Sequence, residues 1–306
     1  MPTEPRARLA RLREAMRQAG IDALVCRLPE NVMFLTDYWP HHGFSVAVFS
    51  QSGEPLLFVP EIEAPYAAQA WATVEEFGWG LLKDGDLYAN YERFLGAAIA
   101  QLGLGGATVG YEQTFEVVGT TYRSSEPVIP AMPWFSLVQK AFSGAHLVDG
   151  AGVLQTARAI KTDYEIEKLK IAAEVAELGM HAFTEKLQPG MSEVEVSALI
   201  EHTIRTAGTG HRGATLIRAW AEVAGGPANT LRATLVIPST PYVIQAGDLV
   251  MVELATVVDG YWSDLTYMAV AGGRPSERQR EVHNAVLEAQ RAAANAVRAG
   301  ALAGDP

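Results

Sequence analysis

The chain has 306 residues, 49% of them hydrophobic and 19% charged, with a formal net charge of −11. This acidity argues against nucleic acid and anionic membrane surfaces as partners. The single cysteine, Cys26, excludes an internal disulfide, and no stretch approaches the ~18 consecutive apolar residues of a membrane span. We therefore expect a cytoplasmic protein that is long enough for two domains.

The first half alternates helical and extended patterns, which predicts an α/β layer domain over residues 1–152. Leu9, Leu12 and Met16 recur at helical spacing in a helix over 5–19, and Gly20 ends it. The elements expected after it are a strand at 21–26, a helix or turn at 31–35, a hairpin of 44–49 with 55–59, helices at 61–71 and 89–102, and a strand at 108–111.

The second half, over residues 160–306, opens with two helices. Thr162 or Asp163 can cap a long helix that runs to about Leu187, and Ser192 with Glu195 forms a capping box for a helix over 193–207. The elements expected next are a strand at 215–222, a turn at 225–229 and strands at 234–237 and 242–244. After the hairpin described below, a helix over 277–298 carries an apolar stripe that we expect to be buried, made of Val282, Val286, Ala289 and Ala293.

Residues 247–270 hold the most informative pattern in the chain. Two apolar runs flank Asp259-Gly260, and Asp-Gly in that setting is a strong signal of a two-residue hairpin turn. Counting along the ladder sets Glu253 opposite Thr266. Because side chains alternate faces with period two, Glu253 and Asp264 then share one face as diagonal neighbours.

Two like charges on one face of an apolar hairpin repel each other unless a cation or a shared proton offsets them. A hard divalent ion fits that requirement. The alternative is an ordinary solvated face of an antiparallel hairpin. Met251, Trp262 and Met268 share the face with the two acids, which favours a face shielded from water and hence the metal.

The hairpin resembles the metal hairpin of the creatinase/aminopeptidase P/prolidase family, the pita-bread metallohydrolases. Those proteins carry Gly-Asp, an apolar run, an acidic ligand, Asp-Gly-Tyr and a second Asp followed by Leu or Ile and Thr. The resemblance implies that Glu253 and Asp264 match the first two ligands of a dinuclear site. The opening Arg-Leu-x-x-Leu-Arg at 8–13 and Gly-Ile-Asp-Ala-Leu-Val at 20–25 are similar to the N-terminal domain of the same family.

The sequence also departs from the family pattern. The first ligand is usually Asp and is Glu253 here, and Tyr267 stands where Arg is usual. The family's histidine before the hairpin falls near Val236, and no histidine occurs between His211 and His283. Arg232 and Thr234 are neighbouring candidates, but neither is a general base near neutral pH.

The remaining family ligands, a histidine in a His-x-x-Gly-His segment and two glutamates, are not found. Asp305-Pro306 is a helix-start signal, so we expect a chain that ends inside the second domain.

The resemblance implies a creatinase-like α/β domain followed by an incomplete α+β pita-bread domain. It also implies metal-dependent hydrolysis of a peptide C–N bond of the Xaa-Pro type, with two divalent ions (Mn, Co or Mg), a small peptide substrate and a homodimer. With only two ligands present, we expect this chain by itself to be inactive. The alternatives are a metal-free creatinase-like amidinohydrolase and a non-catalytic module for binding or dimerisation.

Overall fold

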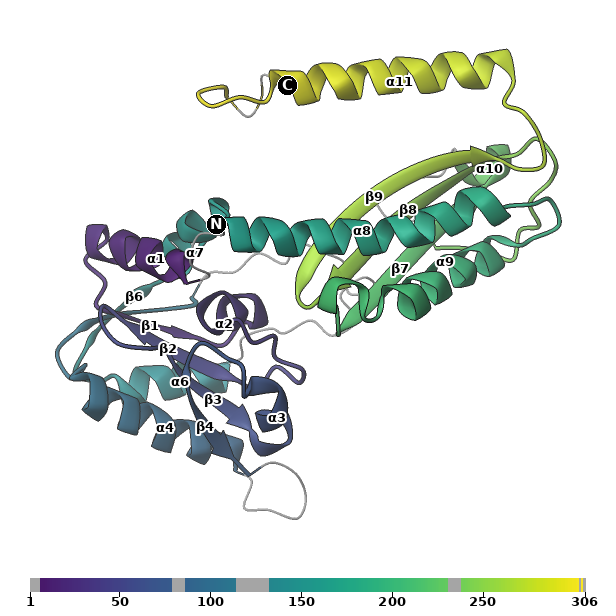
Figure 1. Cartoon of the computed structure of the whole chain (residues 1–306). Helices are drawn as coiled ribbons and strands as arrows, with labels where there is room; N and C mark the ends of the chain where they lie inside the picture. The colour runs from purple at the N-terminus through teal and green to yellow at the C-terminus, as the bar shows by residue number, and fades with distance from the viewer. Residues whose placement is uncertain (1–5, 79–85, 114–131, 231–237, 303, 305–306) are drawn as a thin grey trace. The chain divides into compact units, whose positions relative to one another are not determined.

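The computed structural model describes residues 6–78, 86–113, 132–230, 238–302 and 304. The chain divides into two compact units (Figure 1). The first contains Met1–Ala172 together with Val257–Trp262, and the second contains Ala173–Thr256 with Ser263–Pro306. The short segment 257–262, which is the tip of a hairpin, therefore belongs to the first unit.

A six-stranded mixed sheet forms the centre of the first unit, in the order β4-β3-β2-β1-β5-β6. The central strand β1 runs antiparallel to β2 and parallel to β5. β2 and β3 are antiparallel, whereas β3 with β4 and β5 with β6 are parallel. The strands are β1 (Ala23–Cys26), β2 (Val46–Ser50), β3 (Leu56–Pro60), β4 (Thr73–Phe77), β5 (Thr108–Tyr111) and β6 (His146–Asp149).

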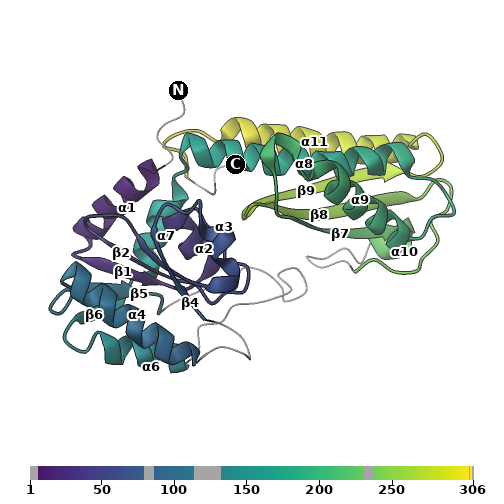
Figure 2. The same cartoon turned by 60° about the horizontal axis from the view of Figure 1, so that its bottom comes forward.

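Helices cover both faces of this sheet, and the alternation of side chains along β1 shows how (Figure 2). Ala23 and Val25 point into a core completed by helices α4 (Leu87–Leu102) and α6 (Met132–Ala141). Leu24 and Cys26 point into a second core on the opposite face. That core is completed by α1 (Ala7–Gln18), α2 (Pro29–Thr36) and α7 (Ala151–Ala159).

β1 is buried on both sides, so its residues form the continuous apolar run expected of a central strand. The predicted α/β layer domain is confirmed. The helix expected over 61–71 is shorter, a 3-10 turn η1 (Glu61–Glu63) followed by α3 (Ala64–Ala67).

The second unit packs helices on a three-stranded sheet of order β7-β8-β9, made of β7 (Ile217–Gly225), β8 (Leu249–Val258) and β9 (Tyr261–Val270). Helix α9 (Glu193–Gly208) begins with the predicted capping box of Ser192 and Glu195. Helix α8 (Asp163–Lys186) runs beside it. A Cβ at Gly179 of α8 would lie 2.7 Å from Ile204 Cδ1 of α9, so only glycine permits this close approach.

Three details of the second half differ from the expectations. Gly226–Thr230 forms the short helix α10 instead of a turn, and the Thr230 hydroxyl donates a hydrogen bond to the Gly226 carbonyl oxygen at 2.8 Å. Helix α11 (Glu277–Ala296) has the capping box of Ser276 and Gln279 but no buried residue.

Val282 and Val286 are 48% and 64% exposed, so the prediction of a buried stripe on α11 is wrong. The apolar spacing identifies a face of the helix, but no residue of the described ranges covers that face. The third difference is the strand expected at 242–244, where the structure has only an isolated bridge between Val243 and Ser192.

Within the described ranges, no helix combines the length and the apolar character needed to cross a bilayer.

Candidate functional site

The hairpin of β8 and β9 turns at the two residues predicted from the sequence. β8 ends at Val258 and β9 begins at Tyr261, so Asp259 and Gly260 alone form the turn. Their φ angles are 48° and 85°. Two positive φ angles in succession define a type I′ turn, for which Asp-Gly is a preferred pair. The predicted turn is confirmed.

The register of the hairpin places Glu253 beside Thr266. A two-residue turn sets Val258 opposite Tyr261, and counting back from there sets Glu253 opposite Thr266. The Thr266 hydroxyl donates a hydrogen bond to Glu253 Oε2 at 2.5 Å, in agreement with this count. The same count places Asp264 on the face of Glu253, as a diagonal neighbour about 7–8 Å away at the backbone.

The face that carries the two acids is open to solvent in the described part of the chain. Glu253 is half-buried and Asp264 is exposed. Trp262 and Met268 on the same face are 49% and 39% exposed, whereas Leu254 on the opposite face is fully buried. The expectation that apolar neighbours shield the acidic face is therefore wrong for these residues, because the core of this unit lies against the other side of β8.

Two carboxylates on one face suit a hard divalent cation, because carboxylate oxygens are preferred ligands of Mg²⁺ and Mn²⁺. Among the residues that the structure describes, no group of three or more His, Cys, Asp or Glu side chains is placed to hold an ion. The donor chemistry of Glu253 and Asp264 suits such an ion. Arg232, Thr234 and Val236, the positions considered for the family histidine, lie outside the described residues.

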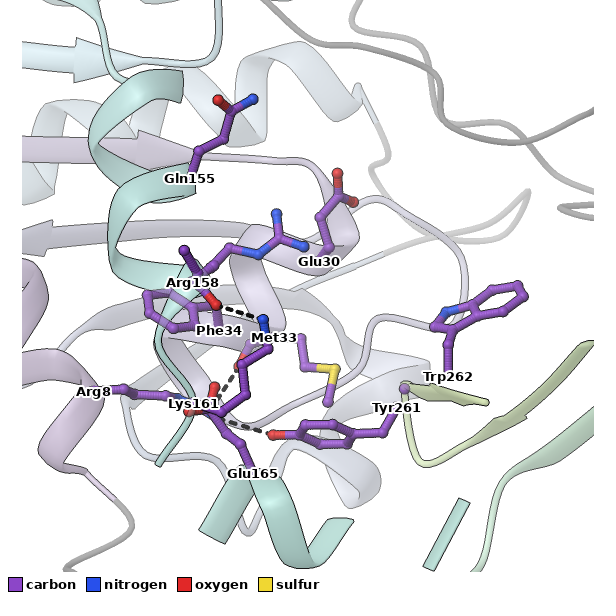
Figure 3. Close-up of a pocket in the computed structure, with 12 residues that line it drawn as sticks. Arg8, Glu30, Met33, Phe34, Gln155, Arg158, Lys161, Glu165, Tyr261 and Trp262 are labelled. Atoms are coloured by element: carbon purple, nitrogen blue, oxygen red, sulfur yellow. Dashed lines mark hydrogen bonds and ion pairs between the residues drawn. The ribbon is translucent and has the colours of Figure 1, made fainter. Parts of the chain in front are cut away.

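A cavity of about 390 Å³ lies in the first unit (Figure 3). Its walls come from α1, α2, the chain from Gln155 to Glu165 and the hairpin turn at 260–262. Gly260 packs closely here, because a Cβ on it would lie 2.7 Å from Met33 Cε. Pockets of this size hold small molecules in other proteins.

Arg8 lies at the base of this cavity and is 1% exposed. Its Nη1 donates to the Tyr261 hydroxyl at 3.0 Å. Its Nη2 donates to the Met33 carbonyl oxygen and to Asp37 Oδ1, each at 3.0 Å. The carboxylate of Glu165 lies 3.6 Å from Nη1. A buried guanidinium needs such partners, so Arg8 joins α1, α2, the start of α8 and the hairpin turn.

Burial also sets the protonation states around Arg8. It raises the pKa of the Asp37 carboxyl above its usual range, although the hydrogen bond from Tyr164 and the charge of Arg8 oppose this. Tyr164 donates to Asp37 Oδ2 at 2.6 Å, and burial together with that carboxylate raises the pKa of Tyr164. Burial raises the pKa of Tyr261 to about 12. Both tyrosines are therefore neutral hydrogen-bonding groups at neutral pH.

The prediction from sequence did not include this network. Its members come from four segments, and the Arg8–Tyr261 pair is separated by 253 positions. In the sequence, Arg8 belongs to the Arg-Leu-x-x-Leu-Arg opening, and amphipathic spacing carries no information on what an arginine contacts.

The α/β unit and the metal-type hairpin define a two-domain protein of the pita-bread hydrolase class. Comparison with protein families agrees with this. Residues 8–160 match the Creatinase/Prolidase N-terminal domain, and residues 167–306 match Metallopeptidase family M24. The chain belongs to the M24 metallopeptidase family, with a creatinase/prolidase N-terminal domain before the M24 domain.

Similar proteins carry dipeptidase names. The chain is 28% identical over 304 residues to a putative dipeptidase, YkvY, of Bacillus subtilis, covering 97% of this chain and 75% of that protein. It is 27% identical over 307 residues to an Xaa-Pro dipeptidase of Pyrococcus furiosus, covering 96% of this chain and 72% of that protein. Among solved structures, an Xaa-Pro dipeptidase from Bacillus anthracis is similar with a TM-score of 0.71 and 26% identity, covering 96% of this chain and 73% of that one.

Proposed function

We propose that this chain has the site architecture of a metal-dependent Xaa-Pro peptidase, which cleaves the peptide bond before a proline. The observation that carries the proposal is the type I′ hairpin that sets Glu253 and Asp264 on one face, within a segment that matches the M24 family. The dipeptidase names of several relatives support the same substrate class.

Glu253 and Asp264 would hold divalent ions at this face. When bound, such ions lower the pKa of water and polarise the scissile carbonyl. The chain itself contributes the placement of the acids. The Thr266 hydroxyl donates a hydrogen bond to Glu253 Oε2, and this bond orients the carboxylate of Glu253. Asp264 is exposed on the neighbouring strand and is accessible to an ion from solvent.

We also propose negligible turnover by this chain. Two carboxylates are a small ligand set for two ions, and even the loss of outer-sphere partners costs roughly 10–100-fold in metal affinity.

We also infer a homodimer in the cytoplasm. The acidic composition and the single cysteine are consistent with that compartment, and light scattering of the purified chain would measure the oligomeric state.

A Mn²⁺ titration by calorimetry, paired with a proline-dipeptide assay, tests the proposal. Glu253→Gln and Asp264→Asn each remove one carboxylate charge with little change of shape, and Glu288→Gln on exposed α11 is the matched control. We expect weak Mn²⁺ binding that both hairpin variants abolish and the control keeps. Equal binding by all four proteins would show that the ion binds elsewhere, and micromolar binding with turnover would overturn the expected inactivity.

A further inference from the structure

Two cationic side chains, Arg158 and Lys161, line the cavity in the first unit. Lys161 donates from Nζ to the Arg158 carbonyl oxygen at 2.8 Å, and Arg158 donates from Nη1 to Asn31 Oδ1 at 3.1 Å. In the described part of the chain, neither Arg158 nor Lys161 forms an ion pair with a carboxylate. Arg8 at the base of the cavity differs from them, because Asp37 and Glu165 offset its charge.

Arg158 is held in place by a chain of buried and part-buried hydrogen bonds. Glu112 is 1% exposed and accepts from the backbone N–H groups of Arg27 and Leu28. It also accepts from Asn31 Nδ2 at 2.8 Å, which orients the amide so that its oxygen meets Arg158. A guanidinium fixed in this way loses less conformational freedom when it binds an anion.

The wall beside these cations is apolar. Met33 and Phe34 of α2 line the cavity and are 8% and 5% exposed. Figure 3 shows Arg158 and Lys161 on one side of the cavity and Trp262 on the other. The cavity therefore offers positive charge next to apolar surface, the combination that binds an amphipathic small molecule.

The net charge of the side chains that line the cavity favours a singly charged anion over a doubly charged one. Glu30 also lines the cavity, is exposed, and has no partner among the described residues. With Arg8 and Glu165 balanced within their own network, the unpaired groups are two cations and one anion. Their sum is one positive charge, which matches a single carboxylate and disfavours a phosphate dianion.

We propose that this cavity binds a small monocarboxylate with an apolar or aromatic body, such as an N-acylated amino acid or the carboxyl end of a short peptide. Arg158 and Lys161 contact the carboxylate, and Met33 and Phe34 contact the body. The proposal does not depend on metal binding by Glu253 and Asp264 or on peptidase activity.

Calorimetry on the full chain with N-acetyl-L-phenylalanine, its primary amide and inorganic phosphate tests this. We expect the acid to bind about tenfold or more tightly than the amide, because a charge-assisted hydrogen bond has that worth. Equal affinities for acid and amide, or no heat from the acid at millimolar concentration, would overturn the proposal. Phosphate that binds as tightly as the acid would overturn the assignment to a monocarboxylate.

Three variants locate the site. Arg158→Gln and Lys161→Gln should each weaken binding of the acid about tenfold and leave the amide unchanged, whereas Arg158→Lys should retain part of the affinity. Arg17→Gln removes a positive charge from the exposed part of α1 and serves as the control. Loss of acid binding in Arg17→Gln, or full binding in both Arg158→Gln and Lys161→Gln, would place the anion elsewhere. Thermal unfolding of each variant confirms that it is folded before titration.

Discussion

Arg8 Nη1 donates a hydrogen bond to the Tyr261 hydroxyl at 3.0 Å, which fixes the tip of the β8–β9 hairpin to helix α1 of the first unit. Of the two partners, Arg8 carries a buried positive charge, whereas Tyr261 is neutral. Its removal leaves Asp37 and Glu165 without their common cation. The tyrosine hydroxyl, by comparison, makes one part-buried hydrogen bond with Arg8.

We expect Tyr261→Phe to lower the free energy of unfolding by about 1 kcal/mol and Arg8→Met by about 3–5 kcal/mol. Urea denaturation of each variant measures both values. Arg17→Met is the control, because Arg17 is exposed on the same helix and pairs with Glu14. An Arg8→Met variant as stable as the control would show that the network has no net stabilising effect.

The close approach of Gly260 to Met33 predicts a steric cost beyond that of backbone strain. Gly260→Ala combines a φ of +85° with a Cβ that meets Met33 Cε at 2.7 Å. Gly20→Ala is the matched control, with a φ of +66° and nothing within 4 Å. We expect about 1–2 kcal/mol of destabilisation from the φ angle in both variants. Gly260→Ala should be further destabilised by a smaller amount, because the end of the flexible Met33 side chain must move to admit the Cβ. Equal values from chemical denaturation would mean that the turn moves away from Met33 without cost.

The raised pKa of Glu112 predicts that the free energy of unfolding depends on pH. Burial raises the pKa of this carboxyl from 4.5 to about 7, although Asn31 and two backbone N–H groups donate to it. The folded chain therefore binds more protons than the unfolded chain between about pH 4.5 and pH 7, so this group makes stability fall as pH rises through that range. The full difference between the folded and unfolded pKa of Glu112 corresponds to about 3 kcal/mol in the free energy of unfolding.

Urea unfolding at a series of pH values compares the parent chain with Glu112→Gln. We expect the variant to have a flatter slope across this range, whatever its absolute stability, because glutamine does not titrate. Glu288→Gln should keep the parent's slope. A Glu112→Gln slope identical to that of the parent would assign the proton uptake to other groups.

We propose that residues 1–152 and 160–306 are the two domains of the chain, and this division predicts an order of proteolysis. Trypsin should cut first near the exposed Lys161, before it cuts within residues 1–140. Lys161 lies between the creatinase/prolidase N-terminal region, 8–160, and the M24 region, 167–306. Mass spectrometry of early fragments measures the order. First cleavage within 1–140 would refute the division.

Local sequence signals account for the parts of the structure that were predicted. The hairpin turn depends on two adjacent residues, Asp259 and Gly260, whose conformational preferences act within the turn itself. The capping box of α9 likewise depends on two residues three positions apart, Ser192 and Glu195.

Burial was predicted less well because it depends on what packs against an element. The spacing of Val282 and Val286 correctly shows one apolar face of α11, yet both side chains are exposed. Trp262 and Met268 were expected to shield the acidic face and are exposed for the same reason. The cavity was missed because Asn31 and Arg158 are distant in sequence, and nothing local to either residue indicates their contact.

Cys26 has a practical consequence for following the unfolding of this protein. The thiol is fully buried in the central strand of the six-stranded sheet, and burial raises its pKa well above the usual range. A thiol reagent needs both access and a thiolate, and the folded sheet provides neither. Because the chain has no other cysteine, the labelling rate of the natural sequence reports the opening of the first unit without any engineered probe.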